Sequence, residues 1–166
     1  MFALDNNTLV SASRDRSVKV WRRSAVDVPF VLDCTLNGHS HFVNCIGYLK
    51  NNAYIEPPIS AASNSTQQSG GCKGWLVTGG MDKLVLMWDL ANHNDPVFTL
   101  IGHTDSVCAV HCNSSTGQIV TASWDKTARV WRDGKCEFVL TGHEYAVWAV
   151  LSISSESNKF VTGIDS

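Results

Sequence analysis

Hydrophobic and polar residues alternate along short stretches of this chain. The stretches are four to eight residues long, rich in β-branched and aromatic residues, and separated by polar turns. Alternation with a period of two predicts half-buried β-strands, and no stretch carries a sustained apolar stripe at helical spacing. The sequence therefore predicts an all-β protein. The expected strands of its middle part are residues 42–49, 75–78, 84–88, 96–101, 107–110, 118–121, 127–131 and 137–140.

An eleven-residue phrase that ends in Trp occurs three times. It reads SASRDRSVKVW at residues 11–21, TGGMDKLVLMW at residues 78–88 and TASWDKTARVW at residues 121–131. Each copy combines small residues with an Asp at the fifth position. A Gly-His pair precedes the second and third copies, and another pair, Gly142-His143, opens one more unit. Internal repeats of this kind determine the architecture of a chain.

The repeats have the spacing of β-propeller blades. His103 and His143 lie 40 residues apart, and Asp82 and Asp125 lie 43 residues apart. Four strands in a unit of about this length are typical of a propeller blade. We expect an incomplete first unit, two full units and an incomplete fourth unit, at residues 1–36, 37–101, 102–141 and 142–166.

The second unit carries an insertion at residues 51–73. His39 precedes Asp82 by 43 residues, whereas His103 precedes Asp125 by only 22. The extra stretch is polar and contains a Pro-Pro and a Gly-Gly pair. Such a composition predicts a long, exposed and mobile loop.

Composition and charge narrow the expected partners. The chain is 44% hydrophobic and 17% charged, with a formal net charge of -2. Because it has no basic stripe, we expect no nucleic-acid partner. It also has no apolar run of about 20 residues, so we expect no membrane partner.

The cysteine pattern indicates structural thiols. None of the six cysteines forms a CxxC pair, and no secretory signal precedes them, which favours reduced thiols over disulfides. Cys108 and Cys112 could share a metal, but both lie in one apolar strand, where a packing role is favoured. We therefore expect neither a metal nor a cofactor.

Gly-His, turn Asp and strand-ending Trp recur in phase, and this pattern resembles the WD-repeat (WD40) family over essentially the whole chain. In that family a His, a strand Ser or Thr, the turn Asp and the Trp form a buried hydrogen-bonded tetrad. The resemblance implies two such tetrads here. Their members are His39, Thr78, Asp82 and Trp88 in the second unit, and His103, Thr121, Asp125 and Trp131 in the third.

The outer units match the family pattern only in part. The first unit has Ser11, Asp15 and Trp21 but no Gly-His pair before them. In the fourth unit Thr162 aligns with the strand Thr, and the turn position then falls on Ser166. With a one-residue deletion, Asp165 takes that position instead. The sequence thus predicts a partial WD40 β-propeller, an open fragment with about three and a half four-stranded blades of seven.

A His, a hydroxyl and an Asp could also be a catalytic triad. A triad is needed once, with an exposed nucleophile, whereas this set recurs in phase and includes an indole donor. The sequence also lacks a metal-ligand cluster, a phosphate-binding Gly loop and paired carboxylates at a recognisable spacing. We therefore expect a structural role for the tetrads and no enzymatic activity.

Three segments carry a narrower resemblance: GWLVTGGMDK, DPVFTLIGHTDSVCAV and TASWDKTARVWRDGKCEFVLTGHEYAVWAV. They are similar to the N-terminal propeller of the phospholipase A-2-activating protein family, whose fungal members are ubiquitin-fusion-degradation proteins. The resemblance implies ubiquitin binding by the propeller. It also implies a role in ubiquitin-dependent proteasomal degradation and ubiquitin homeostasis, in cytoplasm and nucleus. An AAA+ segregase ATPase (valosin-containing protein) is implied as a partner only through domains that these residues do not include.

The residue before each turn Asp, and those just after each Gly-His pair, reach one rim of a WD propeller. Phe42, Met81 and Trp124 are large and apolar at such positions, although the tetrads do not need them there, and such residues are enriched at interface centres. We predict a rim that binds ubiquitin or another protein. It comprises Arg14, Phe42, Met81, Thr104, Trp124 and Glu144.

Two alternatives remain open at this rim. The first concerns Phe42 and Met81, which could simply cover neighbouring loops. Trp148 is not counted in the rim, because its alternation with Val147 and Ala149 favours packing between blades. The alternative function is a generic WD40 scaffold or a substrate adaptor in another multiprotein complex.

Overall fold

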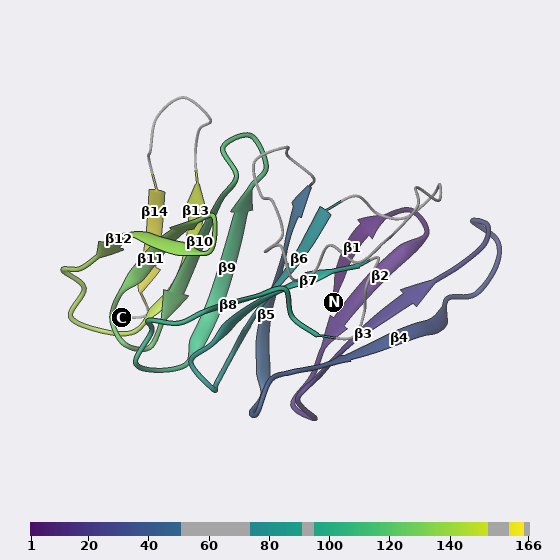
Figure 1. The fold of residues 1–166 in the computed structure, drawn as a ribbon, viewed down its shortest axis with the longest axis horizontal. Coiled ribbons are helices and arrows are strands. Elements are labelled where there is room, and N and C mark those ends of the chain that lie inside the picture. The colour runs from purple at the N-terminus through teal and green to yellow at the C-terminus, as the bar shows by residue number, and fades with distance from the viewer. Residues whose placement is uncertain (51–73, 91–94, 153–159, 165–166) are drawn as a thin grey trace.

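Short alternating strands joined by tight turns give four antiparallel sheets in the computed structural model of this chain, which describes residues 1–50, 74–90, 95–152 and 160–164. Figure 1 shows the sheets following one another in chain order, from the purple N-terminal sheet to the yellow C-terminal one. The prediction of an all-β protein is confirmed, because every helix or strand assigned in the described residues is a strand. The expected mobile insertion at residues 51–73 lies outside the described residues.

Each of the first three sheets is a four-stranded meander in which neighbouring strands pair in sequence order. The first sheet consists of β1 (Phe2–Asp5), β2 (Thr8–Ala12), β3 (Ser17–Arg22) and β4 (Val31–Asn37). The second consists of β5 (Val43–Lys50), β6 (Gly74–Gly80), β7 (Val85–Asp89) and β8 (Phe98–Leu100). The third consists of β9 (Val107–Asn113), β10 (Gln118–Ser123), β11 (Ala128–Arg132) and β12 (Lys135–Leu140).

The fourth sheet contains two described strands, β13 (Val147–Ser152) and β14 (Phe160–Ile164). It packs against the third sheet through β9 and β10. Side chains on its far face, among them Leu151 and Val161, are about half exposed. The open, unclosed arrangement of sheets agrees with the predicted partial propeller.

The middle strands of the second and third sheets are buried on both faces. All six residues of β10 are buried, and so are six of the seven residues of β6. Stacked sheets cover each other face to face, so an internal strand loses the solvent-facing half of its pattern. Polar residues on such strands, for example Thr121, therefore need hydrogen-bond partners inside the protein.

The second and third sheets approach closely enough to require a glycine at the contact. A Cβ added to Gly79 would lie 2.6 Å from the Cys45 Sγ and 2.6 Å from a methyl carbon of Val107. The β-branched Val107 begins the innermost strand of the next blade and is fully buried, so it has little freedom to move aside.

The core divides into two clusters that follow the interfaces between sheets. One cluster joins the first and second sheets and includes Val18, Leu36 and Trp88. The other joins the second and third sheets and includes Val107 and Trp131. Each tetrad Trp thus belongs to the apolar packing and also offers a buried N–H donor.

A Gly79→Ala substitution tests the close contact between sheets. We expect the free energy of unfolding to fall by about 1–3 kcal/mol, because overpacking forces side chains or backbone to shift. The matched control is Gly163→Ala, whose Cβ would meet the Cβ of Ala149 at an ordinary 3.4 Å. Chemical denaturation measures both variants, and equal stability of the two would contradict the close approach at Gly79.

Candidate protein-interaction site

A chain of buried hydrogen bonds joins the second sheet to the loop that precedes it. The indole N–H of Trp88 donates to the Thr78 hydroxyl oxygen at 2.9 Å, and that oxygen lies 2.9 Å from His39 Nε2. His39 Nδ1 lies 2.9 Å from the Asp82 carboxylate, which also accepts the backbone N–H of Ser40 at 2.8 Å. The Gly-His loop and the β6–β7 turn are thereby tied together.

The third sheet repeats this geometry. The Trp131 indole donates to Thr121 Oγ1 at 2.8 Å, His103 Nε2 lies 2.8 Å from the same oxygen, and His103 Nδ1 lies 2.7 Å from Asp125. A carboxylate only accepts hydrogen bonds, so Nδ1 of His103 carries the proton. Nε2 is then the acceptor for the Thr121 hydroxyl. Every member of the set has its donor or acceptor satisfied, with His103 in the neutral form.

The environment of the third tetrad keeps the histidine neutral and the aspartate charged. Burial lowers the pKa of His103 below its ordinary value near 6.5, and outweighs the opposing effect of Asp125. Burial raises the pKa of Asp125, but hydrogen bonds from Thr127, the Thr104 backbone and His103 outweigh it and lower that pKa to about 2. At neutral pH the pair is therefore a neutral imidazole that donates to a carboxylate.

This arrangement cannot serve as a catalytic triad. The hydroxyls of Thr78 and Thr121 belong to residues with 0% exposure, so neither can reach a substrate. Each hydroxyl oxygen is also the acceptor for an indole N–H. The tetrads are structural in this fold.

The outer units hold partial versions of the same network. Trp21 donates to the Ser11 hydroxyl at 2.9 Å, and Asp15 accepts from the backbone and side chain of Ser17. In the fourth unit His143 Nε2 lies 2.6 Å from the Thr162 hydroxyl. Both candidates for its turn position, Asp165 and Ser166, lie outside the described residues.

The turn that carries each Asp has the same backbone conformation in three successive units. Its last residue has a positive φ of 71–73° each time, at Arg16, Lys83 and Lys126. The residue before the Asp donates its backbone N–H to the preceding loop in two units, from Met81 to Phe42 O at 2.8 Å and from Trp124 to Ser106 O at 3.0 Å. The backbone alone therefore holds Met81 and Trp124, and their side chains remain available.

Four of the six predicted rim residues come together around one hollow of about 540 Å³. Arg14, Phe42, Met81 and Trp124 all line it. Phe42, Met81 and Trp124 keep 36%, 37% and 38% of their surface exposed, so none of them is sealed under a loop. Thr104 and Glu144 are exposed as well, but they do not line this hollow.

Trp148 also lines the hollow, contrary to the packing role expected from its sequence. It is 46% exposed, and its ring lies 5.3 Å from the ring of Trp124, centroid to centroid. The pairing of β13 with β14 skips a residue between Val147 and Ala149, so Trp148 sits in a β-bulge. A bulge re-aims a side chain, which alternation in the sequence does not reveal.

The same bulge recurs in the two preceding blades. In β5 the pairing with β6 skips Asn44, between Val43 and Cys45. In β9 the pairing with β10 skips Cys108, between Val107 and Ala109. Asn44 and Cys108 thus occupy the position that Trp148 has in the fourth blade. Both line the hollow, and both bond across to the next blade. Asn44 donates to Val107 O at 3.0 Å, and Cys108 donates to Val147 O at 2.8 Å. In the fourth blade the side chain at this position is Trp148, which adds an aromatic surface.

Three cysteines between the sheets, Cys45, Cys108 and Cys112, are shielded thiols, whereas Cys136 on β12 is exposed. Burial raises the pKa of Cys45 to about 12 and that of Cys108 to about 11, and it also raises the pKa of Cys112. All five described cysteines are free. Within the described ranges, no group of three His, Cys, Asp or Glu side chains could hold a metal ion. No helix that could span a membrane is found there either.

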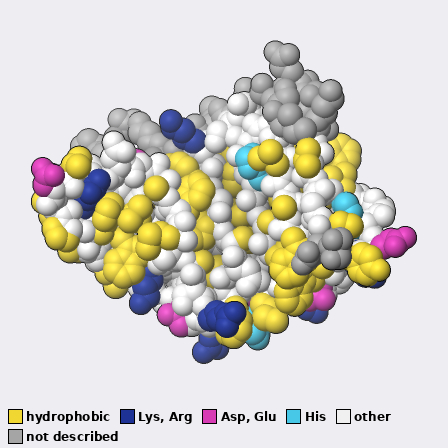
Figure 2. Space-filling view, turned by 180° about the vertical axis from the view of Figure 1, so that it is seen from behind, with side chains coloured by type: hydrophobic (Ala, Val, Ile, Leu, Met, Phe, Trp, Pro, Cys, Tyr) yellow, Lys and Arg dark blue, Asp and Glu magenta, His cyan; other side chains and the backbone are white. Residues whose placement is uncertain are grey.

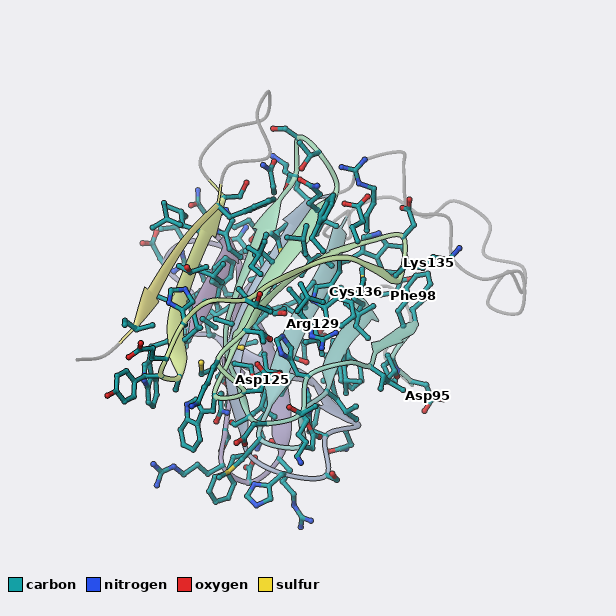
Figure 3. The ribbon with its side chains drawn as sticks, turned by 90° about the vertical axis from the view of Figure 1, so that its left-hand side faces the viewer. Asp95, Phe98, Asp125, Arg129, Lys135 and Cys136 are labelled. Carbon is teal, nitrogen blue, oxygen red and sulfur yellow. The ribbon has the colours of Figure 1, made fainter. Side chains whose placement is uncertain are left out.

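Figures 2 and 3 show how side chains are distributed over the molecule. Figure 2, seen from behind, shows hydrophobic side chains gathered in patches, with Lys or Arg side chains at their margins. Figure 3 shows Arg129 and Cys136 together, with Phe98 and Lys135 beyond them, while Asp125 lies apart. Lys135, at the start of β12, thus lies away from the turn that carries Asp125.

A family model described as WD domain, G-beta repeat matches residues 2–22, 31–89, 94–132 and 134–166. Among solved structures, the WD40 beta propeller domain of Doa1 resembles this chain with a TM-score of 0.73 and 28% sequence identity. The match covers 96% of this chain and 46% of that one.

Two proteins of similar sequence are 34% identical to this chain. Phospholipase A-2-activating protein of Xenopus laevis matches over 141 residues, 85% of this chain and 15% of that protein. Ubiquitin homeostasis protein lub1 of Schizosaccharomyces pombe matches over 138 residues, 82% of this chain and 16% of that protein. The chain thus spans less than a fifth of the length of either relative.

A Thr121→Ala substitution tests the central hydroxyl of the third tetrad. We expect a loss of about 1–3 kcal/mol in the free energy of unfolding, because the Trp131 indole and His103 Nε2 lose their shared partner while buried. The matched control, Thr104→Ala, removes an exposed hydroxyl and should change stability by less than about 0.5 kcal/mol. Thermal and denaturant unfolding compare the two variants. A Thr121 variant as stable as the control would refute the role given to this hydroxyl.

Acid should destabilise the fold in two steps. Because the pKa of His103 is lowered in the fold, the unfolded chain takes up this proton more readily than the folded one. The stabilisation that neutral His103 contributes is therefore complete above about pH 6.5 and is lost as the pH falls below that value. The contribution of Asp125 is complete above its ordinary pKa of 3.8 and is lost as the pH falls toward about 2. Denaturant unfolding at a series of pH values measures both steps. Burial lowers the pKa of His111 as well, so a His103→Gln variant should show a smaller first step, and an unchanged profile would refute the assignment to His103.

Proposed function

This chain belongs to the WD40 family, and from this premise we propose that it is a protein-interaction propeller that binds ubiquitin through the rim of the 540 Å³ hollow. WD40 propellers and the relatives found here are scaffold proteins without enzymatic activity, in agreement with the expectation from sequence. The hollow is the observation that carries the proposal. It gathers Phe42, Met81, Trp124 and Trp148 from three successive blades, each with more than a third of its surface exposed.

The chemistry of the rim fits a compact apolar patch on a partner. Large apolar side chains that remain exposed over a contiguous area are typical of protein-interaction sites. Trp and Met are enriched at the centres of interfaces, where they supply most of the binding free energy. Ubiquitin presents such an apolar patch flanked by basic residues, and the exposed carboxylate of Glu144 is available to pair with them.

The name of one relative supports ubiquitin as the partner, because lub1 is called a ubiquitin homeostasis protein. The Doa1 propeller supports the fold, which it shares with this chain. We propose a role in ubiquitin-dependent degradation and ubiquitin homeostasis, in cytoplasm and nucleus. Contact with an AAA+ segregase would be made by other parts of a longer protein.

A Trp124→Ala substitution tests the rim. Truncation of a central aromatic anchor typically costs at least about 2 kcal/mol, so the affinity for ubiquitin should fall about thirtyfold. The fold should survive, because Trp131 and not Trp124 belongs to the tetrad. The measurement is an NMR titration of isotope-labelled ubiquitin with the full-length protein, and circular dichroism monitors the fold.

The control is Phe138→Ala, which removes a half-exposed aromatic from the outer strand β12 and should leave binding unchanged. If Trp124→Ala keeps the wild-type affinity, the rim assignment is wrong. If the wild-type protein shows no ubiquitin binding at all, the scaffold or adaptor function takes the place of this proposal.

A further inference from the structure

Arg14 differs in chemistry from the residues at its equivalent positions in the next two blades. It precedes the turn Asp, as Met81 and Trp124 do, and it is the charged member of the three. It lines the apolar hollow of about 540 Å³ and also a second hollow of about 460 Å³ beside it. Phe42 is shared by the two hollows in the same way. Arg14 thus stands at the boundary between an apolar and a polar recess.

The guanidinium of Arg14 is oriented by an aromatic ring and forms no ion pair with an acidic side chain among the described residues. Its central carbon lies 5.7 Å from the centroid of the Phe42 ring, within the range of a cation–π contact. The ion pairs of arginine in the described parts of the chain are Arg22 with Asp33 and Arg132 with Glu137. The adjacent Asp15 carboxylate instead accepts from the backbone and side chain of Ser17, at 2.9 and 2.6 Å.

The second hollow is rich in hydrogen-bond donors. Besides Arg14 and Phe42 it is lined by Asp15, Arg16, Ser40 and His41. His41 Nδ1 accepts the backbone N–H of Phe42 at 2.8 Å, so in the neutral ring the proton is on Nε2. Two guanidinium groups, an imidazole N–H and a hydroxyl therefore surround this recess. Its one carboxylate, Asp15, accepts two hydrogen bonds from Ser17 on its Oδ1 atom.

We infer that the rim is bipartite and selects a partner protein whose apolar contact group is flanked by a carboxylate. The apolar group enters the hollow formed by Phe42, Met81 and Trp124, and the carboxylate pairs with Arg14 and Arg16 in the adjoining recess. This inference rests on the proposed function in using the same rim. It adds that the partner carries a carboxylate on the Arg14 side of its apolar group, whereas basic residues of the partner would face Glu144, which lies outside the hollow.

Physical chemistry gives this charge a role in specificity. A guanidinium presents a rigid fork of donors that matches a carboxylate in two parallel hydrogen bonds, and the Phe42 contact reduces the freedom that binding would otherwise remove. A partner seated in the apolar hollow also excludes water from Arg14, which strengthens the pairing. A partner with a basic residue at the same place would be rejected, because like charges would face each other.

A pair of small probes tests the inference without assuming the partner. Phenylacetate and phenylacetamide share a ring and a shape, but only the first carries a carboxylate. Saturation-transfer NMR with the full-length protein measures both affinities. We expect wild type to prefer phenylacetate by about fivefold, the upper range for an exposed ion pair. Arg14→Gln should abolish this preference, whereas the control Lys135→Gln, which removes a distant exposed charge on β12, should keep it.

Equal affinity of wild type for the two probes, or a preference that persists in Arg14→Gln, overturns the inference. Arg14→Met, which copies Met81, provides a second variant in case the glutamine side chain disturbs the turn. It should bind both probes equally.

Measuring ubiquitin binding to wild type and to Arg14→Gln distinguishes a failure of this inference from a failure of the proposed function. If ubiquitin binds but its affinity and salt dependence are the same for wild type and Arg14→Gln, and the probes show no preference, the inference fails and the proposed function stands. If the probes show the preference and ubiquitin does not bind, the inference stands, and a different partner with a carboxylate beside its apolar group replaces ubiquitin.

Discussion

In the second and third blades, one buried hydroxyl, that of Thr78 or Thr121, holds together the parts on which the candidate site depends. Thr121 accepts the indole N–H of Trp131 and donates to His103, whose other nitrogen reaches the Asp125 carboxylate. This chain of bonds runs from the apolar core to the solvent-facing turn. Because a buried donor without a partner is costly, separation of the loop from the turn is unfavourable: it would break the bonds of His103 and the Thr104 backbone to Asp125. The position of the rim side chains follows from this constraint.

Most of the fold could be predicted because repetition multiplies a weak signal. One Gly-His pair or one Trp means little, but three phrases in phase predicted stacked four-stranded sheets, and the structure has them. The tetrad residues were also accessible, since buried polar groups at fixed spacing must satisfy one another. His103, Thr121, Asp125 and Trp131 are within hydrogen-bond distance as their spacing suggested.

The role of Trp148 could not be predicted, because it depends on strand register and not on residue type. In sequence it alternates with Val147 and Ala149, which suggests a side chain packed between blades. The bulge at this point interrupts the alternation and turns Trp148 toward Trp124. Equivalent bulges at Asn44 and Cys108 show that the device belongs to the blade itself, but a bulge leaves no composition signal in a single copy.

The rim combines a constant backbone with variable side chains. Arg14, Met81 and Trp124 occupy the same position of the same turn, and the backbone N–H groups of the latter two bond to the loop of their own blade. The tetrads and the turn therefore do not depend on these side chains, whereas burial and close packing restrict the residue type at Thr121 and at Gly79. The same turn position therefore accommodates a guanidinium at Arg14, a thioether at Met81 and an indole at Trp124 around one hollow. The chemical differences between blades at this position, and not the repeat itself, give the surface its capacity to distinguish one partner from another.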